Sequence, residues 1–190
     1  MVLLEAMKFD IPIIASNNSA IPEVLGSKHP GLAETGNALD FGDKTASNSY
    51  GASCSSPTRG LFAGGTATLT NIIDYVTIAT TGNATDFGDL LTNLYYMASC
   101  SNSTRGLFAG GDGTPGTTNV IQYVTIASTG NATDFGDLTT GGTWGLAGAA
   151  STTRGIFGGG YVSGNINTIQ HVTIASTGNS GYFGDLTVTV

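Results

Sequence analysis

The chain has 190 residues, a length that suits one domain or one domain with a short appendage. Its residues are 40% hydrophobic, enough to fill a core, but only 10% charged, with a net charge of −7. Six Lys and Arg residues cannot form the basic surface that nucleic acids require, and no apolar run reaches the length of a membrane span, so we expect neither partner.

The first part of the chain differs in pattern from the rest. Leu3 to Lys8 has the apolar spacing of a helix end, Ile11 to Ala15 is typical of a buried strand, and Ile21 to Leu25 of a short helix start. The sequence therefore predicts a short α/β appendage over residues 1–30.

The wording of this appendage, with Leu-Glu-Ala-Met, Ile-Ala-Ser and Pro-Glu-Val in that order, resembles the donor-site segment of retaining GT-B glycosyltransferases. The resemblance implies that Glu5 matches the family's ribose-contacting glutamate. It also supports an alternative function, residual sugar-nucleotide binding through Glu5 and Glu23 in a glycosyltransferase-derived protein. Asp10 stands where the family has glycine, and the match ends at residue 26. We therefore expect a relic, a gene fusion or a sequence-assembly artefact rather than a working transferase.

From residue 36 to residue 190 the chain repeats itself. Phe-Gly-Asp begins at positions 41, 87, 135 and 183, with spacings of 46, 48 and 48 residues. A second block, Thr-Arg-Gly-(Leu/Ile)-Phe, leads to a double glycine. A third block, (Asp/Gln)-(Tyr/His)-Val-Thr-Ile-Ala, leads to Thr-Gly-Asn. Blocks that recur in the same order indicate a repeat protein.

Each repeat has an apolar period of two residues, which predicts strands. One unit contains four strand-like runs, at residues 95–101, 105–109, 120–126 and 132–139. We define repeat 1 as residues 49–92, repeat 2 as 94–140 and repeat 3 as 143–190, and residues 36–44 as an orphan fourth strand. The predicted fold class is all-β, with three four-stranded antiparallel units.

This strand order resembles the blade of kelch-type β-propellers. Tyr75 and Tyr123 match the kelch tyrosine, whereas His171 departs from it, and phenylalanine replaces the kelch tryptophan. The double glycines match at Gly64-Gly65, Gly110-Gly111 and Gly159-Gly160. Because closed propellers typically have four to eight blades, three blades imply one of three arrangements. Partner chains complete the ring, the chain is part of a longer array, or the arc stays open. Two copies would form a six-bladed ring.

One arginine recurs in each repeat, at Arg59, Arg105 and Arg154. A guanidinium group can bind a carboxylate through two parallel hydrogen bonds. We therefore expect ion pairs between neighbouring repeats with the aspartates of Phe-Gly-Asp, which are Asp89, Asp137 and Asp185. A ring of arginines that binds a ligand is the alternative.

Motifs that indicate catalysis or metal binding are scarce. Asn83, Asp86 and Asp89 have a spacing that could gather calcium, but turn capping explains these residue types, and we expect no metal or cofactor. Cys54 and Cys100 occupy equivalent positions and are expected to be reduced, buried residues. The two histidines have no partners for nucleophilic catalysis, so the protein is not expected to be an enzyme.

Four aromatic residues do not follow the repeat: Tyr95, Tyr96, Trp144 and Tyr161. They fall near loops, where they are candidates for ligand binding, because aromatic rings can stack on sugars. Packing is the alternative. The variable loops at residues 66–71, 112–119 and 161–167 are the expected binding surface.

The wording Ala-Ser-Thr-Gly-Asn-Ala-Thr-Asp-Phe-Gly-Asp-Leu-Thr also resembles repeat proteins of tailed phages of marine cyanobacteria. The resemblance implies a virion protein, such as a tail fibre, that is made in the host cytoplasm; otherwise the protein is expected to be cytoplasmic. We therefore predict a non-catalytic structural or adhesive module. Its expected partners are host glycans or proteins, a second copy in a homodimer, or other virion proteins.

Overall fold

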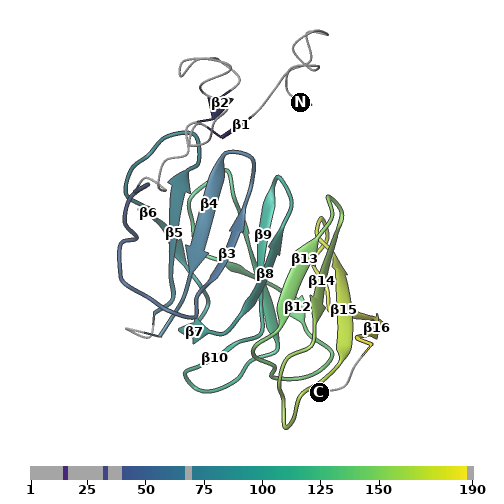
Figure 1. The fold of residues 1–190 in the computed structure, drawn as a ribbon. Helices are drawn as coiled ribbons and strands as arrows, with labels where there is room; N and C mark the ends of the chain where they lie inside the picture. Colours follow the sequence, from purple (N-terminus) through teal and green to yellow (C-terminus); the bar gives the residue numbers. More distant parts are fainter. Residues whose placement is uncertain (1–14, 17–31, 34–39, 67–69, 188–190) are drawn as a thin grey trace, which may run out of the picture. The chain divides into compact units, whose positions relative to one another are not determined.

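A computed structural model describes residues 15–16, 32–33, 40–66 and 70–187 (Figure 1). The chain divides into two compact units, Met1–Asp40 and Phe41–Val190. In the first unit, β1 (Ala15–Ser16) pairs in parallel with β2 (Leu32–Ala33). The helices expected at residues 3–8 and 21–25 lie outside the described residues, as does the strand expected at 11–15 except for its last residue.

The second unit contains three four-stranded antiparallel sheets, one for each repeat. The first sheet consists of β3 (Ala52–Ser55), β4 (Arg59–Ala63), β5 (Ile72–Thr77) and β6 (Thr85–Asp89). The second consists of β8 (Ala98–Ser101), β9 (Arg105–Ala109), β11 (Val120–Thr125) and β12 (Thr133–Asp137). The third consists of β13 (Ala147–Ala150), β14 (Arg154–Gly158), β15 (Thr168–Thr173) and β16 (Gly181–Asp185). The all-β prediction is thereby confirmed, and the described residues contain no helix.

Two segments differ from the expected strands. The run predicted at residues 95–101 is divided between β8 and β7 (Leu94–Tyr95), which pairs with β10 (Asp112–Gly113) in a separate small sheet. The orphan strand predicted at 36–44 is not a strand in its described part. Instead, the carbonyls of Phe41 and Asp43 each accept a hydrogen bond at 2.8 Å from the first sheet, at Gly82 and Ala84. The reason is that residues 40–44 have no third strand of their own to pair with.

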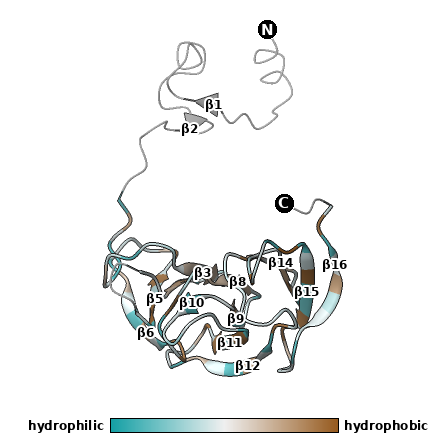
Figure 2. Cartoon of the chain, turned by 90° about the horizontal axis from the view of Figure 1, so that it is seen from below, coloured by the Kyte–Doolittle hydropathy of each residue, from teal (hydrophilic) through white to brown (hydrophobic). Residues whose placement is uncertain are grey.

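The three sheets stand side by side in chain order. Figure 2 shows β3 and β8 toward the inside of the unit and β6, β12 and β16 along its outer rim. Neighbouring first strands contact each other, β3 with β8 and β8 with β13. The sheets therefore pack face against face.

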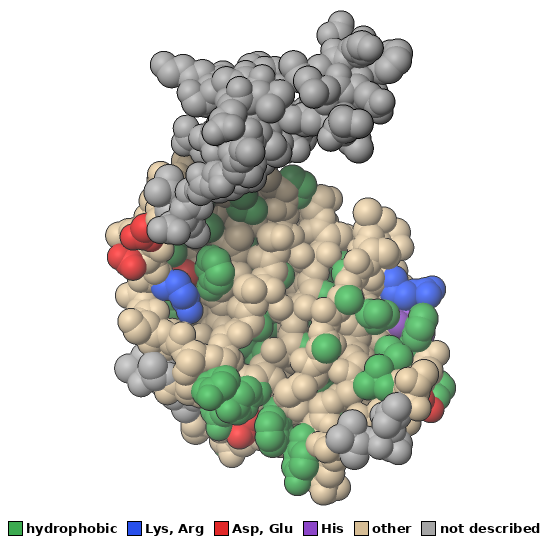
Figure 3. Space-filling view, in the orientation of Figure 1, with side chains coloured by type: hydrophobic (Ala, Val, Ile, Leu, Met, Phe, Trp, Pro, Cys, Tyr) green, Lys and Arg blue, Asp and Glu red, His purple; other side chains and the backbone are tan. Residues whose placement is uncertain are grey.

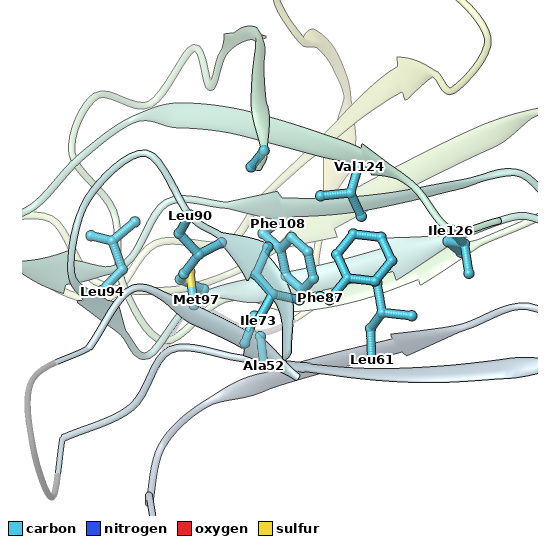
Figure 4. Close-up of a cluster of buried hydrophobic side chains, with 12 residues drawn as sticks. Ala52, Leu61, Ile73, Phe87, Leu90, Leu94, Met97, Phe108, Val124 and Ile126 are labelled. Atoms are coloured by element: carbon cyan, nitrogen blue, oxygen red, sulfur yellow. The ribbon is translucent and has the colours of Figure 1, made fainter. Parts of the chain in front are cut away.

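The core lies between the sheets and not within any one of them. Leu61 and Phe87 of the first sheet meet Val124 and Ile126 of the second, and all four are at most 3% exposed (Figure 4). Between the second and third sheets, the equivalent set is Leu107, Phe135, Val172 and Ile174. Burial of each large apolar side chain stabilises the fold by roughly 1.5–3 kcal/mol, so these two junctions are the main apolar source of stability.

Hydrogen bonds recur at the same junctions. The buried side-chain oxygens of Gln122 and Gln170 accept the backbone N–H groups of Leu91 and Thr139, at 2.8 and 2.6 Å. In addition, the amide oxygens of Asn131 and Asn179 accept the backbone N–H groups of Asp89 and Asp137 at 3.0 Å. The second and third sheets thus each hold the end of the preceding outer strand through one buried and one exposed side chain.

The arginines also link the sheets, but not to the partners that the sequence suggested. Arg59 and Arg105 donate hydrogen bonds at 2.9 Å to the carbonyls of Ile126 and Ile174 in the next sheet. Among the described residues, no ion pair joins Arg59, Arg105 or Arg154 to Asp89, Asp137 or Asp185. The reason is register, because Ile126 follows the last residue of β11, whereas Asp137 of the same sheet lies opposite Val120, the first residue of β11. The predicted aspartate pairing is therefore wrong.

Candidate functional site

The two ends of the sheets carry different connections. The loop end, as we define it, holds the segments before each first strand and the loops between second and third strands. The two kinds of segment approach each other within a repeat. In repeat 1 the N–H of Thr66 donates to the carbonyl of Ser49 at 3.0 Å, and in repeat 3 the N–H of Tyr161 donates to the carbonyl of Trp144 at 2.9 Å. The hairpin end holds the turns between first and second strands and the Thr-Gly-Asn hairpins. The sequence varies among repeats mainly at the loop end.

Five aromatic rings form a contiguous row across the loop end. The ring centroids of Tyr50 and Tyr96 lie 4.5 Å apart, those of Tyr96 and Trp144 5.4 Å, and those of Trp144 and Tyr161 5.2 Å. Tyr95 lies 5.1 Å from Tyr96. We define these five residues as the aromatic row. Figure 3 shows hydrophobic side chains gathered along the lower edge of the face in view, where Figure 1 places β7 and β10.

The structure brings together all four aromatic residues that the sequence singled out. It adds Tyr50, which the sequence reasoning missed. The signal was present, because Tyr50 precedes Tyr96 by the 46-residue spacing of the first two Phe-Gly-Asp motifs. The row therefore contains two pairs of equivalent positions, Tyr50 with Tyr96 and Tyr95 with Trp144, together with Tyr161, whose equivalent in repeat 2 is Asp112.

The backbone of the row is strained and bonded from sheet to sheet. Tyr50 and Tyr96 have φ angles of 58° and 55°, in the left-handed region, and Gly145 occupies the equivalent position in repeat 3. The N–H of Tyr96 donates to the carbonyl of Tyr50, and that of Gly145 to the carbonyl of Tyr96, each at 2.9 Å. A left-handed residue with a side chain costs about 1–2 kcal/mol, and such strain often accompanies function.

The aromatic row is partly open to solvent and has polar groups beside it. Tyr50 is 57% exposed and Tyr161 39%, while the other three rings are half-buried. The hydroxyl of Tyr95 donates to a carboxylate oxygen of Asp112 at 2.8 Å, and this hydrogen bond is the main cause of the raised pKa of Tyr95. A hollow of about 370 Å³ lies beside Trp144 and Tyr161 and is also lined by Asn165. The arrangement offers apolar ring surface together with a carboxylate and an amide.

The other candidate polar residues have structural contacts. The carboxylates of Asp86 and Asp134 accept hydrogen bonds from Gly88 and Gly136 two residues later, as turn capping predicts. Asp185 accepts a hydrogen bond from the Tyr182 hydroxyl at 2.8 Å. No cluster of three or more His, Cys, Asp or Glu side chains suited to a metal ion occurs within the described parts of the chain. Glu5 and Glu23 lie outside the described residues.

Both cysteines lie at the junctions between sheets. They are free thiols, as expected, with Cys100 buried and Cys54 half-buried. Burial raises the pKa of the Cys100 thiol to about 12, and burial together with the nearby Cys100 raises the pKa of the Cys54 thiol to about 12. The thiolate is the reactive form of cysteine, so these two groups are chemically inert at neutral pH.

Comparison with protein-family models and with curated proteins finds no match to this chain. Within the described residues, no helix is both long enough and apolar enough to span a membrane. The aromatic row is therefore the observation on which a functional proposal can rest.

Proposed function

We propose that the repeat region is a non-catalytic adhesive module whose aromatic row binds carbohydrate. The observation that carries this proposal is the contact of five partly exposed rings at one end of the sheets, on backbone held in an unfavourable conformation. Tyrosine and tryptophan combine a large apolar face with a polar edge. Such faces stack on the C–H groups of sugar rings, and Asp112 and Asn165 supply polar groups for the sugar hydroxyls.

The sheets support this function as a rigid scaffold. The rings come from segments that are hydrogen-bonded to their neighbours, so they lose little conformational freedom when a ligand binds. Tyrosine and tryptophan also have few rotatable bonds for the area they present. The row is thus suited to extended ligands that present apolar C–H faces, such as the sugar rings of a polysaccharide chain.

The biological setting that we propose rests on the resemblance of the repeat sequence to repeat proteins of tailed phages. In that setting the module belongs to a virion or its tail, and the ligand is a glycan on the host surface. A structural role among other virion proteins is part of the same proposal, because a stack of sheets can carry a binding surface away from its attachment point.

A glycan array that carries bacterial O-antigen and capsular polysaccharides tests the proposal, with the labelled full chain as probe. We expect retention on a subset of these glycans, with loss of at least about tenfold in affinity for Trp144→Ala and for Tyr50→Gly. Tyr50→Gly is informative because repeat 3 has glycine at this position, so the fold should tolerate the change. Its melting temperature should not fall.

Tyr182→Asp is the matched control for this test. Tyr182 is 62% exposed on β16, and repeats 1 and 2 have aspartate there, at Asp86 and Asp134. The control should bind glycans like the unmodified chain. Binding that is equally strong in all three variants, or no binding to any glycan, would contradict the proposed role of the aromatic row.

A further inference from the structure

The two outermost sheet faces of the repeat region carry the same residues that form its internal junctions. Phe183, on the outer face of the third sheet, is 51% exposed, whereas its equivalent Phe135 is 3% exposed. Ile78, beside the outer face of the first sheet, is 46% exposed, whereas its equivalent Ile126 is 1% exposed. We define the N-terminal face by Gly60, Phe62, Val76 and Ile78, and the C-terminal face by Ala149, Arg154, Ile156, Phe183 and Leu186.

Each face is hollowed where a neighbouring sheet would fit. A cavity of about 420 Å³ on the third sheet is lined by Ala149, Arg154, Ile156 and Phe183 among others. A cavity of about 320 Å³ on the first sheet is lined by Gly60, Phe62, Val76 and Ile78 among others. At the internal junctions, the equivalent positions are covered by the adjacent sheet, the following sheet for the C-terminal face and the preceding sheet for the N-terminal face.

We propose that the C-terminal face of one copy of this chain binds the N-terminal face of a second copy, head to tail, in the geometry of the internal junctions. Both internal junctions join these same two sets of positions, so each open face has a partner of matching shape at the other end of the molecule. A second copy of this chain is therefore the partner for these faces, because the same two sets of positions already pack against each other within one chain.

The small residues in the junctions support this fit. The sulfur of Cys54 lies 2.6 Å from where a Cβ at Gly106 would stand, and the sulfur of Cys100 lies 2.7 Å from the same point at Gly155. Only glycine can face the cysteine at such a distance. Gly60 is the equivalent glycine on the N-terminal face, and there the Cβ position meets only Val76 and Ile78 of its own sheet. In the joined copies, Ala149 covers Gly60.

The polar contacts extend in the same way. Arg59 and Arg105 each donate to a carbonyl in the next sheet, so Arg154 has an equivalent acceptor in the Ile78 carbonyl of the second copy. The hydroxyls of Ser99 and Ser101 donate to the carbonyls of Ser53 and Ser55 at 2.6 and 2.7 Å. By the same geometry, Ser53 and Ser55 of the second copy donate to the carbonyls of residues 148 and 150.

Residues 41–45 occupy part of the N-terminal face in the single chain. Phe41 and Asp43 accept hydrogen bonds from the Thr-Gly-Asn hairpin of the first sheet, as Phe87 and Asp89 do from the second. The Thr45 hydroxyl donates to the buried carboxylate of Asp74 at 2.6 Å. This segment takes the place of a preceding outer strand.

In the joined copies, β16 of one copy takes the place of residues 41–45 of the other. The two segments have the same residues at the equivalent positions, because Phe183, Asp185 and Thr187 correspond to Phe41, Asp43 and Thr45. β16 is held by a ladder to β15, whereas residues 40–45 belong to no strand. The segment, and not β16, is therefore the part that leaves.

Sedimentation velocity of the full chain over a range of micromolar concentrations tests the proposal. We expect concentration-dependent assembly into dimers or larger species. Phe183→Asp and Ile78→Asp should each raise the dissociation constant by at least about 100-fold, because each buries a charge in an apolar contact. An equimolar mixture of the two variants should recover dimers, because one intact pair of faces remains.

Two controls separate this contact from a general surface effect. Tyr182→Asp and Thr77→Asp change exposed residues adjacent in sequence to Phe183 and Ile78, and both should assemble like the unmodified chain. Thr45→Ala, which weakens the hold on residues 41–45, should strengthen assembly severalfold.

Three results would overturn the proposal. The first is an unmodified chain that stays monomeric at the highest concentration. The second is assembly that survives both face variants, which would indicate another surface. The third is a mixture of the two variants that remains monomeric, which would exclude head-to-tail pairing. Weaker assembly of Thr45→Ala would overturn the displacement of residues 41–45.

Discussion

The second and third sheets share their strand order and most of their sequence blocks, but only the second has a sheet against each of its faces. Leu138 is 2% exposed in the second sheet, and its equivalent Leu186 is 46% exposed in the third. Arg105 donates to a carbonyl of the next sheet, whereas the Arg154 guanidinium lies over the Phe183 ring of its own sheet, 5.8 Å from the ring centroid. Each sheet therefore contributes one side of the apolar core on each of its two faces. Whether a given residue is buried depends on whether another sheet packs against that face.

The largest expected effect concerns the first glycine of the double-glycine motif. A Cβ at Gly110 would lie 2.3 Å from the Thr143 carbonyl oxygen in the next repeat, while at Gly159 the nearest atom is the end of the Leu186 side chain at 3.4 Å. Both have left-handed φ angles, 63° and 67°. Gly110→Ala should lower the free energy of unfolding by about 3 kcal/mol or more, and Gly159→Ala by about 1–2 kcal/mol. Urea unfolding measures both, and equal losses would contradict the role given to the neighbouring repeat.

A smaller effect is expected at the buried glutamine of the second sheet. Gln122→Met removes the acceptor of the Leu91 N–H while keeping the side-chain size. An unsatisfied buried N–H costs about 1–3 kcal/mol, so unfolding should become easier by that amount. Thr125→Val, an exposed change on the same strand, should alter the stability by less than about 0.5 kcal/mol. A neutral Gln122→Met variant would show that the junction does not depend on this bond.

Two equivalent arginines test the comparison directly, because Arg105 lies at the junction between the second and third sheets and Arg154 lies on the outer face of the third sheet. Arg105→Ala removes the hydrogen bond to Ile174 and the contact with the Tyr123 ring at 4.6 Å, and should reduce stability by about 1–2 kcal/mol. Arg154→Ala removes an exposed side chain and should change it by less than about 0.5 kcal/mol. The measurement is made on the monomeric Ile78→Asp background, which leaves the Phe183 ring beside Arg154 in place, so that assembly does not contribute. Equal effects would mean that the bond between sheets adds nothing.

The smallest expected effect on stability at neutral pH is that of the two cysteine thiols, Cys54 and Cys100. Burial raises the pKa of Cys54 from 9.0 to about 12, so the folded chain keeps a proton that the unfolded chain loses. Stability should be unaffected below about pH 9 and should fall as the pH rises from 9 toward 12. Cys54→Ala, which copies Ala149 of repeat 3, should make this fall less steep. Thermal unfolding followed against pH measures the difference, and an unchanged slope would contradict it.

Much of the fold could be predicted from the sequence because it depends on local patterns. The strand expected at residues 105–109 matches β9 in both bounds, since a period-two apolar pattern between turn residues specifies a strand by itself. The sequence did not reveal the partner of Arg105, because that partner is a carbonyl 69 residues away in the next sheet. Backbone acceptors carry no residue-specific signal, so only the packing of sheet on sheet identifies them.

The candidate site shows the same division. The sequence singled out Tyr95, Tyr96, Trp144 and Tyr161 because they lie near loops and outside the three shared sequence blocks. It missed Tyr50, although Tyr50 is the equivalent of Tyr96 in the preceding repeat. That these rings touch depends on how the start of one sheet meets the start of the next.

The sequence by itself determined the number of repeats, the order of four strands in each and the positions of their turns, because these depend on spacing and on residues near in the chain. Only the tertiary structure decided which faces are buried, which carbonyls the arginines reach and that five rings form one row. Those features arise from contacts between sheets, and a contact between sheets exists only when two faces meet in a particular register.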